Sequence, residues 1–359
     1  MKDILKIYRE ACEETFTRPR VESTPESRNR IHFIDLAKGL CILLVCILHS
    51  DLNEYMPPVF GLLRMPFYFF ISGLFFKDYG SVLSHAVRKI NKILIPAIFF
   101  YAVTYIFVRL GGKFGFMPLK EESFWSVIFN DIQYCMPVWF LFSLFFCNLI
   151  FCIIYRACNG RRLYIFFSVL ACCSIGYILY QTGTRLFLYF DTSLTAMPFF
   201  FAGWCMRDIN LLKPSSFDNK MFWMSVVAIA AIILIYRFIP GLGIDFRNNL
   251  FPESGTLTTY ILGLIFIVAT LGILKKIQWL PFLSYIGKYS LIVLCIHSQL
   301  LNIFNGAIAG SNGVAAFGLT LIVCWLAIPV LKEYLPGFTA QKDSLRIPSI
   351  IKPSSNKAC

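Results

Sequence analysis

The stretch FIDLAKGLCILLVCILHSD, residues 33–51, decides the fold because it is long and apolar enough to cross a bilayer. It also carries three ionisable side chains, Asp35, Lys38 and His49. An ionisable group costs about 2.5–3.5 kcal/mol at the centre of a membrane helix, so such groups should face protein or a wet cavity. The sequence therefore predicts a membrane helix with one polar face.

The composition of the whole chain agrees with this prediction. Of 359 residues, 57% are hydrophobic and only 15% are charged, and the mean hydropathy is +0.67. This balance excludes a soluble globular protein, a disordered chain and a coiled-coil rod. The 13 cysteines are too dilute for a disulfide scaffold, and the four histidines lack close ligand spacing, so no metal is predicted.

Ten apolar stretches approach the length of about 20 residues that a membrane helix needs. We therefore predict an all-α fold, a polytopic membrane protein with about ten transmembrane helices. The stretches are residues 34–52, 57–76, 93–111, 135–156, 164–182, 186–206, 221–239, 256–274, 285–304 and 314–332.

The distribution of basic residues predicts the orientation. Of the 33 Lys and Arg residues, 25 fall on the side of the termini and six on the opposite side, while Lys38 and Arg64 fall inside spans. By the positive-inside rule, both termini are expected in the cytoplasm, with the protein in the inner membrane. Tails 1–33 and 334–359 would then flank a membrane domain at 34–333. The net charge of +13 reflects topology, so no nucleic-acid partner is predicted.

The two tails have different compositions. Residues 1–30 are polar and carry charges of both signs, so no cleavable signal peptide is expected there. Residues 4–16 could form an amphipathic helix on the membrane surface. The segment after Tyr334 is rich in Pro, Ser and Lys, and we expect it to be disordered.

The spacing within the first span places its ionisable residues on one face. Lys38 and His49 are eleven residues apart, which at about 100° per residue leaves about 20° after three turns, with a rise of about 16 Å. Asp35 joins the same stripe. Asp35 and Lys38 could form an interfacial ion pair while His49 points outward, or the stripe could line a wet cavity in which His49 acts as a general base.

The second span contains Arg64 in its outer half, where a guanidinium needs an anionic or dipolar partner. It could be a structural counter-ion for Asp51 or Glu54, or it could stabilise a reacting group. Ser72 and Gly73 of the same span favour close helix packing over chemistry.

Two further groups of polar residues flank later spans. Arg88, Lys89 and Lys92 could anchor lipid headgroups, or they could hold the phosphates of a cytosolic ligand. Ser290 and His297 are seven residues apart and therefore share a helix face. His297 is predicted at a depth similar to that of the first-span histidine, as a packing residue or a site member.

These segments resemble the acyltransferase-3 family of integral membrane acyltransferases, especially its fucose 4-O-acetylase-like branch. The first span is similar to that family's basic-x10-His signature, with Lys38 in place of the more usual Arg. Four more segments resemble family elements in the same order: RMPFYFFISGLFFK (64–77), VRKINKILIPAIFFY (87–101), VWFLFSLFF (138–146) and IGKYSLIVLCIHS (286–298).

The resemblance implies a ten-helix enzyme that moves an acyl group, commonly acetyl, from cytosolic acyl-CoA to a hydroxyl of a cell-envelope glycan. The catalytic role falls on His49, with Lys38 as its basic partner. Lys keeps the charge of Arg but lacks its planar fork, so a bidentate contact is not expected.

A mechanism follows from this resemblance. The basic residues 88, 89 and 92 would hold the CoA phosphates, and the pantetheine arm would pass Lys38. His49 would deprotonate a hydroxyl of a glycan or lipid-linked saccharide, with Arg64 or a backbone N–H stabilising the oxyanion. A transient acyl-histidine is the other possibility. Trp139 could stack on a sugar or belong to an interfacial belt. Further possible site members are Asp35, Ser72, Ser290 and His297.

A rival hypothesis is a non-enzymatic transporter or flippase of polysaccharides or small molecules. In it, Asp35, Lys38, Arg64 and His49 would line a conduit for protons or substrate. We see no inverted repeat in the sequence, but the buried charges suit this alternative.

Overall fold

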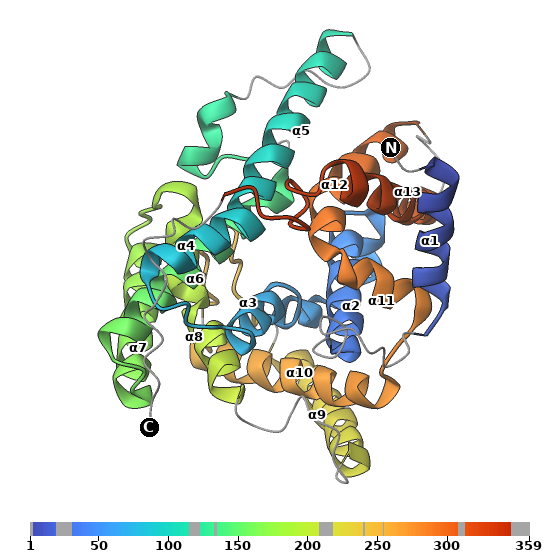
Figure 1. Cartoon of the computed structure of the whole chain (residues 1–359). Coiled ribbons are helices and arrows are strands. Elements are labelled where there is room, and N and C mark those ends of the chain that lie inside the picture. The colour runs from blue at the N-terminus through green and yellow to red at the C-terminus, as the bar shows by residue number, and fades with distance from the viewer. Residues whose placement is uncertain are drawn as a thin grey trace, which may run out of the picture.

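The computed structural model describes residues 3–18, 31–114, 123–132, 135–207, 218–239, 241–253, 255–307 and 313–345. Across these residues the chain is helical and forms no strand, which confirms the predicted all-α fold (Figure 1). The α-helices are α1 (Ile4–Phe16), α2 (His32–Leu48), α3 (Arg64–Leu74), α4 (Val82–Lys89), α5 (Ile95–Lys113), α6 (Trp139–Ala157), α7 (Arg162–Gln181), α8 (Phe190–Met206), α9 (Asp218–Phe238), α10 (Thr256–Ile277), α11 (Pro281–Lys288), α12 (Ser290–Ala307) and α13 (Gly313–Tyr334).

Six helical segments of the described chain are long and apolar enough to cross a membrane, which supports a polytopic membrane protein. They are Val82–Lys113, which joins α4 to α5, and helices α6, α7, α9, α10 and α13. A seventh span results if α11 and α12, which meet at a bend of 97°, count as one.

The count of six or seven differs from the ten predicted because three of the expected spans form short helices. Helix α3 has 11 residues, and α2 and α8 have 17 each, so they rise only about 17–26 Å. The chain ends α2 before two 3₁₀ turns, at Asp51–Tyr55 and Pro58–Leu62, which lead into α3. Left-handed backbone at Leu188 and Tyr189 precedes α8. These short helices are largely buried by the others.

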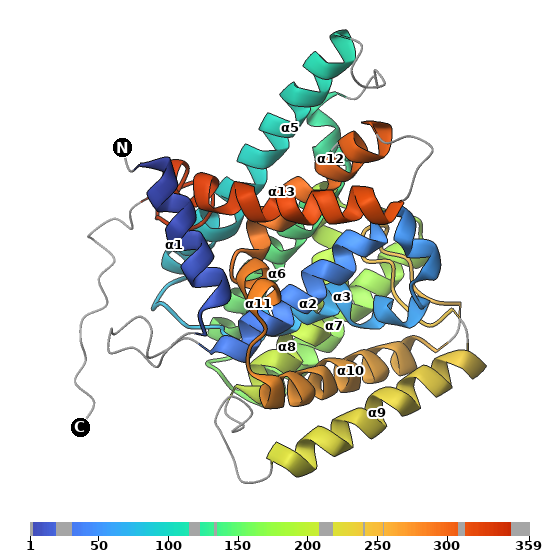
Figure 2. The same ribbon diagram turned by 90° about the vertical axis from the view of Figure 1, so that its right-hand side faces the viewer.

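Helix α2 lies at the centre of the bundle and packs on α3, α10, α11 and α12 (Figure 2). Its contact with α11 is a backbone contact. A Cβ added at Gly39 would lie 1.9 Å from the carbonyl oxygen of Leu283, and one added at Gly287 would lie 1.9 Å from that of Asp35. Only glycine fits at these two positions, so the crossing fixes where the polar stripe of α2 lies.

Helices α3 and α8 cross equally closely. A Cβ at Gly73 would lie 1.9 Å from the carbonyl oxygen of Phe200, and one at Gly203 would lie 1.9 Å from that of Phe70. The close-packing role predicted for Gly73 is therefore observed. Its neighbour Ser72 faces α6 instead.

Helix α9 lies at the periphery, outside α10, in both views (Figures 1 and 2). It packs along α10, and only Ser225 and Ile232 of its residues are buried. Most of its surface is apolar and exposed, as expected of a helix that faces lipid.

The predicted amphipathic helix at residues 4–16 is present as α1, but it packs on α11 and α13. Trp325 donates a hydrogen bond to the Thr15 hydroxyl at 2.9 Å. Glu14 pairs with Lys288 and Lys332. Burial raises the pKa of Glu14, but the two lysines outweigh it and hold that pKa below its usual value. This pairing therefore stabilises the fold above the usual carboxyl range and is lost as the pH falls through the lowered pKa.

Residues 335–345 of the C-terminal segment are ordered, in contrast to the expected disorder. Asn91 donates a side-chain hydrogen bond to the carbonyl oxygen of Leu345 at 2.8 Å, and Phe338 stacks on Phe99 with ring centroids 4.2 Å apart. We call residues 335–345 the C-terminal strap, because they connect the end of α13 to α5 and the turn before it. The remaining tail lies outside the described residues.

Candidate functional site

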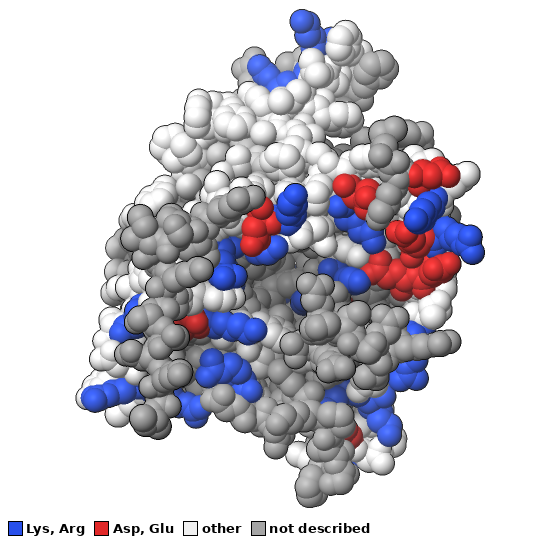
Figure 3. Space-filling model, in the orientation of Figure 1, with Lys and Arg blue, Asp and Glu red and all other residues white. Residues whose placement is uncertain are grey.

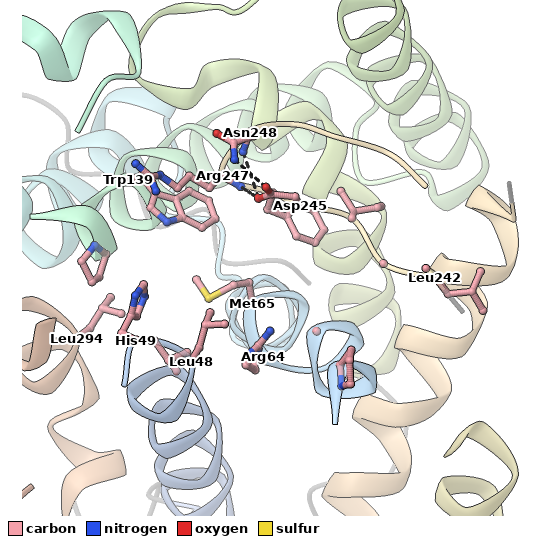
Figure 4. A pocket seen from close by; sticks show the side chains of 18 of the residues that line it. Leu48, His49, Arg64, Met65, Trp139, Leu242, Asp245, Arg247, Asn248 and Leu294 are labelled. Atoms are coloured by element: carbon pink, nitrogen blue, oxygen red, sulfur yellow. Dashed lines mark hydrogen bonds between the residues drawn. The ribbon is translucent and has the colours of Figure 1, made fainter. Parts of the chain in front are cut away.

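A cavity of about 600 Å³ opens at the C-terminal end of α2 (Figure 4). Three residues singled out from the sequence, His49, Arg64 and Trp139, line it together. The loop at 241–248 supplies a further polar wall, and Figure 4 shows this loop and Trp139 on one side, facing His49 and Arg64 on the other. The cavity is therefore a polar site between helices that are far apart in the sequence.

His49 directly follows α2 and is its C-cap residue. Its backbone N–H bonds to the carbonyl oxygen of Val45 at 3.3 Å, but its own backbone has left the helical conformation. Its ring lies in the cavity and faces the ring of His297, with the two centroids 5.4 Å apart. The structure thus brings together two of the four histidines, at the similar depth that the sequence predicted.

His297 comes from α12 and is fully buried. Its Nδ1 lies 2.9 Å from the carbonyl oxygen of Val293, which can only accept a hydrogen bond. A neutral His297 therefore carries its proton on Nδ1 and leaves Nε2 as an acceptor. That Nε2 is buried and has no hydrogen-bond partner among the described atoms, so it is free to accept one from a group in the cavity.

Arg64 is the first residue of α3, where a cation is electrostatically unfavourable because the helix N-terminus carries partial positive charge. Its Nη1 is buried and has no partner among the described atoms. The suggested counter-ions, Asp51 and Glu54, form no ion pair with it in the described chain. A guanidinium and a helix N-terminus at one place form a site for an anion.

The loop wall was not identified from the sequence. Asp245 and Leu250 exchange two backbone hydrogen bonds of 2.9 and 3.0 Å, which closes a tight turn. The Asp245 carboxylate accepts hydrogen bonds from the Asn248 side chain at 2.7 Å and from the N–H of Arg247 at 3.0 Å. The run D-x-R-N-N in an outer loop was the available signal, but its position depends on contacts remote in sequence.

Helix α8 holds this turn in place. Thr192 donates a hydrogen bond to the carbonyl oxygen of Phe246 at 2.7 Å. Arg185 contacts the buried carboxylate of Asp191 at 2.5 Å and donates to the carbonyl oxygen of Arg247 at 2.9 Å. The acidic residue that interrupts the sixth predicted span therefore positions the wall of the cavity.

A second polar group lies deeper along α2. Lys38 Nζ is 3.7 Å from Asp35 Oδ1, so the predicted ion pair is present. Tyr68, which the sequence did not single out, donates its hydroxyl to the carbonyl oxygen of Lys38 at 2.9 Å and also contacts the Ser290 side chain. Lys38 does not line the cavity. The polar stripe on α2 thus lies inside the bundle. Asp35 and Lys38 form the polar group at one end, and His49 belongs to the cavity at the other.

Ser72 belongs to neither group. Its hydroxyl accepts a hydrogen bond from the side-chain amide of Asn148 on α6 at 3.0 Å. This contact is a packing interaction between α3 and α6.

The three basic residues near α4 point to different partners. Arg88 lies over the ring of Tyr79, with its guanidinium carbon 4.4 Å from the centroid. Lys92 pairs with Asp343 of the C-terminal strap at 3.0 Å. Lys89 is directed towards α6. A π-helical turn at residues 90–94 follows α4, and Lys92 lies within it.

Lys and Arg side chains gather on the face that carries these residues (Figure 3). Among the described residues, no group of three or more His, Cys, Asp or Glu side chains could hold a metal ion. The site described above therefore rests on imidazole, guanidinium, indole and amide groups.

The described chain is a helical membrane domain, and its polar cavity holds a pair of histidines. These features define a multi-pass membrane protein whose cavity resembles the site of an enzyme. Residues 31–330 match the family of the acyltransferase-3 type, described as an acyltransferase domain. Because this match covers most of the chain, the protein belongs to that family, and the family supports a membrane acyltransferase. Neither the curated proteins nor the solved structures include a match to the chain.

Proposed function

We propose that this protein is an O-acyltransferase of the fucose 4-O-acetylase-like branch. It moves an acyl group, in the first instance acetyl, from cytosolic acyl-CoA to a hydroxyl of a cell-envelope glycan or glycolipid. The observation that carries the proposal is the cavity in which His49 and His297 face each other beside Arg64, whose Nη1 is buried without a hydrogen-bond partner in the described chain. The protein would lie in the inner membrane with both termini in the cytoplasm.

The chemistry requires a base and a stabiliser of negative charge. The His49 imidazole takes the proton of the acceptor hydroxyl while the oxygen attacks the thioester carbonyl. Arg64 and the first N–H groups of α3 stabilise the oxyanion that forms. The C–S bond then breaks, and the leaving thiolate takes the proton from the imidazolium.

His297 acts in this scheme as a positioning residue. Its Nε2 is an acceptor next to the His49 ring, so it can receive the N–H of that ring once a substrate brings the two rings closer. The other imidazole nitrogen of His49 is then the one that accepts the hydroxyl proton. Trp139 offers an apolar face for a sugar ring, and Asn248 offers a polar edge for its hydroxyls.

The donor is assigned to the opposite side of the bundle. Arg88, Lys89 and Lys92 supply charge for the CoA phosphates, although Lys92 must first leave Asp343. The acyl-pantetheine arm would pass the polar group formed by Lys38 and Tyr68. The rise of about 16 Å along α2 from Lys38 to His49 is within reach of such an arm.

The test is acyl transfer by purified protein in lipid nanodiscs, supplied with radiolabelled acetyl-CoA and envelope glycan. His49→Ala should lower transfer by about 10²–10⁴, the usual contribution of a general base. His32→Ala, at the other end of the same helix, is the matched control and should transfer normally. Retained labelling with His49→Ala would remove this residue from the chemistry.

The same assay decides between this proposal and a transporter. If the wild-type protein consumes no acyl-CoA with any acceptor, the buried charges belong to a conduit. The mass of the intact protein after exposure to acyl-CoA alone separates direct transfer from an acyl-histidine intermediate.

A further inference from the structure

An apolar groove of about 690 Å³ lies beside the cavity. One wall is the start of the second 3₁₀ turn, residues 57–59, and the other is a stripe of α9. The residues of that stripe are Ala230, Ile233, Leu234 and Arg237, and their spacing of three and four places them on one helix face. Because α9 is the peripheral helix of the bundle, this groove faces lipid.

The groove and the cavity are adjacent. Pro58 and Tyr236 line both of them. Tyr236 is also near enough to Arg64 to interact with it electrostatically. An elongated molecule lying in the groove would therefore reach the ring of His49 by passing Tyr236.

The charges near this junction favour an anion. Arg237 is the only cation among the described residues that line the groove, and it is exposed. Arg64 lies on the cavity side with Nη1 buried and unpartnered. A phosphate lying between hydrocarbon and sugar would have a guanidinium on each side of it.

We propose that the groove binds the hydrocarbon chain of a membrane-anchored acceptor, a saccharide joined to a long apolar chain through a phosphate. The chain lies between α9 and residues 57–59, the phosphate contacts Arg237, and the sugar enters the cavity at His49, where Arg64 remains available to the reacting group. This inference rests on the proposed function and specifies its acceptor. A free polysaccharide lacks the apolar segment that the groove accommodates.

The groove can be tested by binding, without catalysis. Protein in phosphatidylcholine nanodiscs is photolabelled with a polyisoprenyl phosphate that carries a diazirine in its chain, and the labelled peptides are mapped by mass spectrometry. We expect label at residues 230–237. Arg237→Gln should lower labelling by the phosphate probe about tenfold, because a charge-assisted hydrogen bond is lost. Labelling by the uncharged polyisoprenol probe should not change.

A filling substitution supplies the second arm. Ala230→Trp should abolish labelling because the indole occupies the groove. Ala231→Trp places the same side chain on the next residue of α9, which does not line the groove, and should label as the wild type does. Equal labelling of these two variants would overturn the proposal.

Two further measurements distinguish failure of the groove proposal from failure of the proposed chemistry. His49→Ala should label normally, so loss of transfer with intact labelling concerns the proposed chemistry and not the groove. Excess phosphatidylglycerol should not displace the probe. If it does, the groove is a general site for anionic phospholipid and the proposal is wrong.

Discussion

The cavity at His49 and the basic edge near α4 differ in how their polar groups are used. In the cavity, Arg64 Nη1 and His297 Nε2 are buried without partners in the described chain. At the basic edge, formed by Arg88, Lys89 and Lys92, the Arg88 guanidinium already lies over the ring of Tyr79. Lys92 already forms an ion pair with Asp343. The cavity is organised for a ligand before it arrives, whereas the edge must exchange partners to bind one. Substitutions in the cavity should therefore change the rate, and substitutions at the edge should change donor affinity.

The largest effect that tests this contrast is expected at Arg64. Arg64→Gln should lower kcat by about 10²–10³, as for loss of one oxyanion donor, with little change in KM for acyl-CoA. The free energy of unfolding should not fall, because Arg64 is a cation at the N-terminus of α3, where positive charge is unfavourable. Steady-state kinetics of acetyl transfer check the first point and thermal unfolding checks the second. A change confined to KM would contradict the assigned role.

A smaller loss is expected at His297. His297→Ala removes the acceptor that orients the His49 ring, and misplacement of a reacting group by about 1 Å costs about 10²-fold in rate. His297→Gln should recover part of kcat, since its amide oxygen can also accept a hydrogen bond. If the Ala and Gln variants were equally impaired, His297 would have only a packing role.

At the basic edge the comparison predicts opposite effects of two substitutions. Lys92→Gln should raise KM for acyl-CoA about tenfold through loss of a charge-assisted contact. Asp343→Asn should lower that KM, because the C-terminal strap no longer competes for Lys92. Neither should change kcat. An unchanged KM in both variants would return Lys92 to a structural or lipid-anchoring role.

The smallest effect on chemistry is expected where α3 crosses α8. Gly73→Ala places a methyl group against the backbone of Phe200 and should lower the free energy of unfolding by about 1–3 kcal/mol. Gly318→Ala is the matched control, because a Cβ there meets nothing within 4 Å. Thermal unfolding in detergent distinguishes them. Equal stability would show that the crossing adjusts readily and does not hold Arg64 in place.

The sequence predicted those features that depend on one helix or one motif. Hydropathy predicted the all-α membrane fold, and the eleven-residue spacing placed Lys38 and His49 on one buried stripe. The sequence predicted a comparable depth for His49 and His297 but not their contact, which depends on the packing of α12 on α2. These features follow from local periodicity and from apolar length.

The features that the sequence did not predict depend on breaks in the helices and on contacts between residues that are far apart in the sequence. Fewer helices of the described chain reach spanning length than the ten predicted, because left-handed residues and 3₁₀ turns shorten α2, α3 and α8. The contact of Lys92 with Asp343 depends on the C-terminal strap, which lies about 250 residues further along the chain. Arg247 and Asn248 join the site because remote contacts from Arg185, Thr192 and Ile132 hold their loop, and no spacing within the loop predicts those contacts.

The bend of 97° between α11 and α12 leaves a single residue, Tyr289, between two helices of different direction. One arm of this elbow touches the N-terminal helix through Lys288, and the other carries His297. The positions of Lys288 and His297 are thus linked through one bend of the backbone. The ion pair at the N-terminal helix and the histidine pair therefore share one bent helical element.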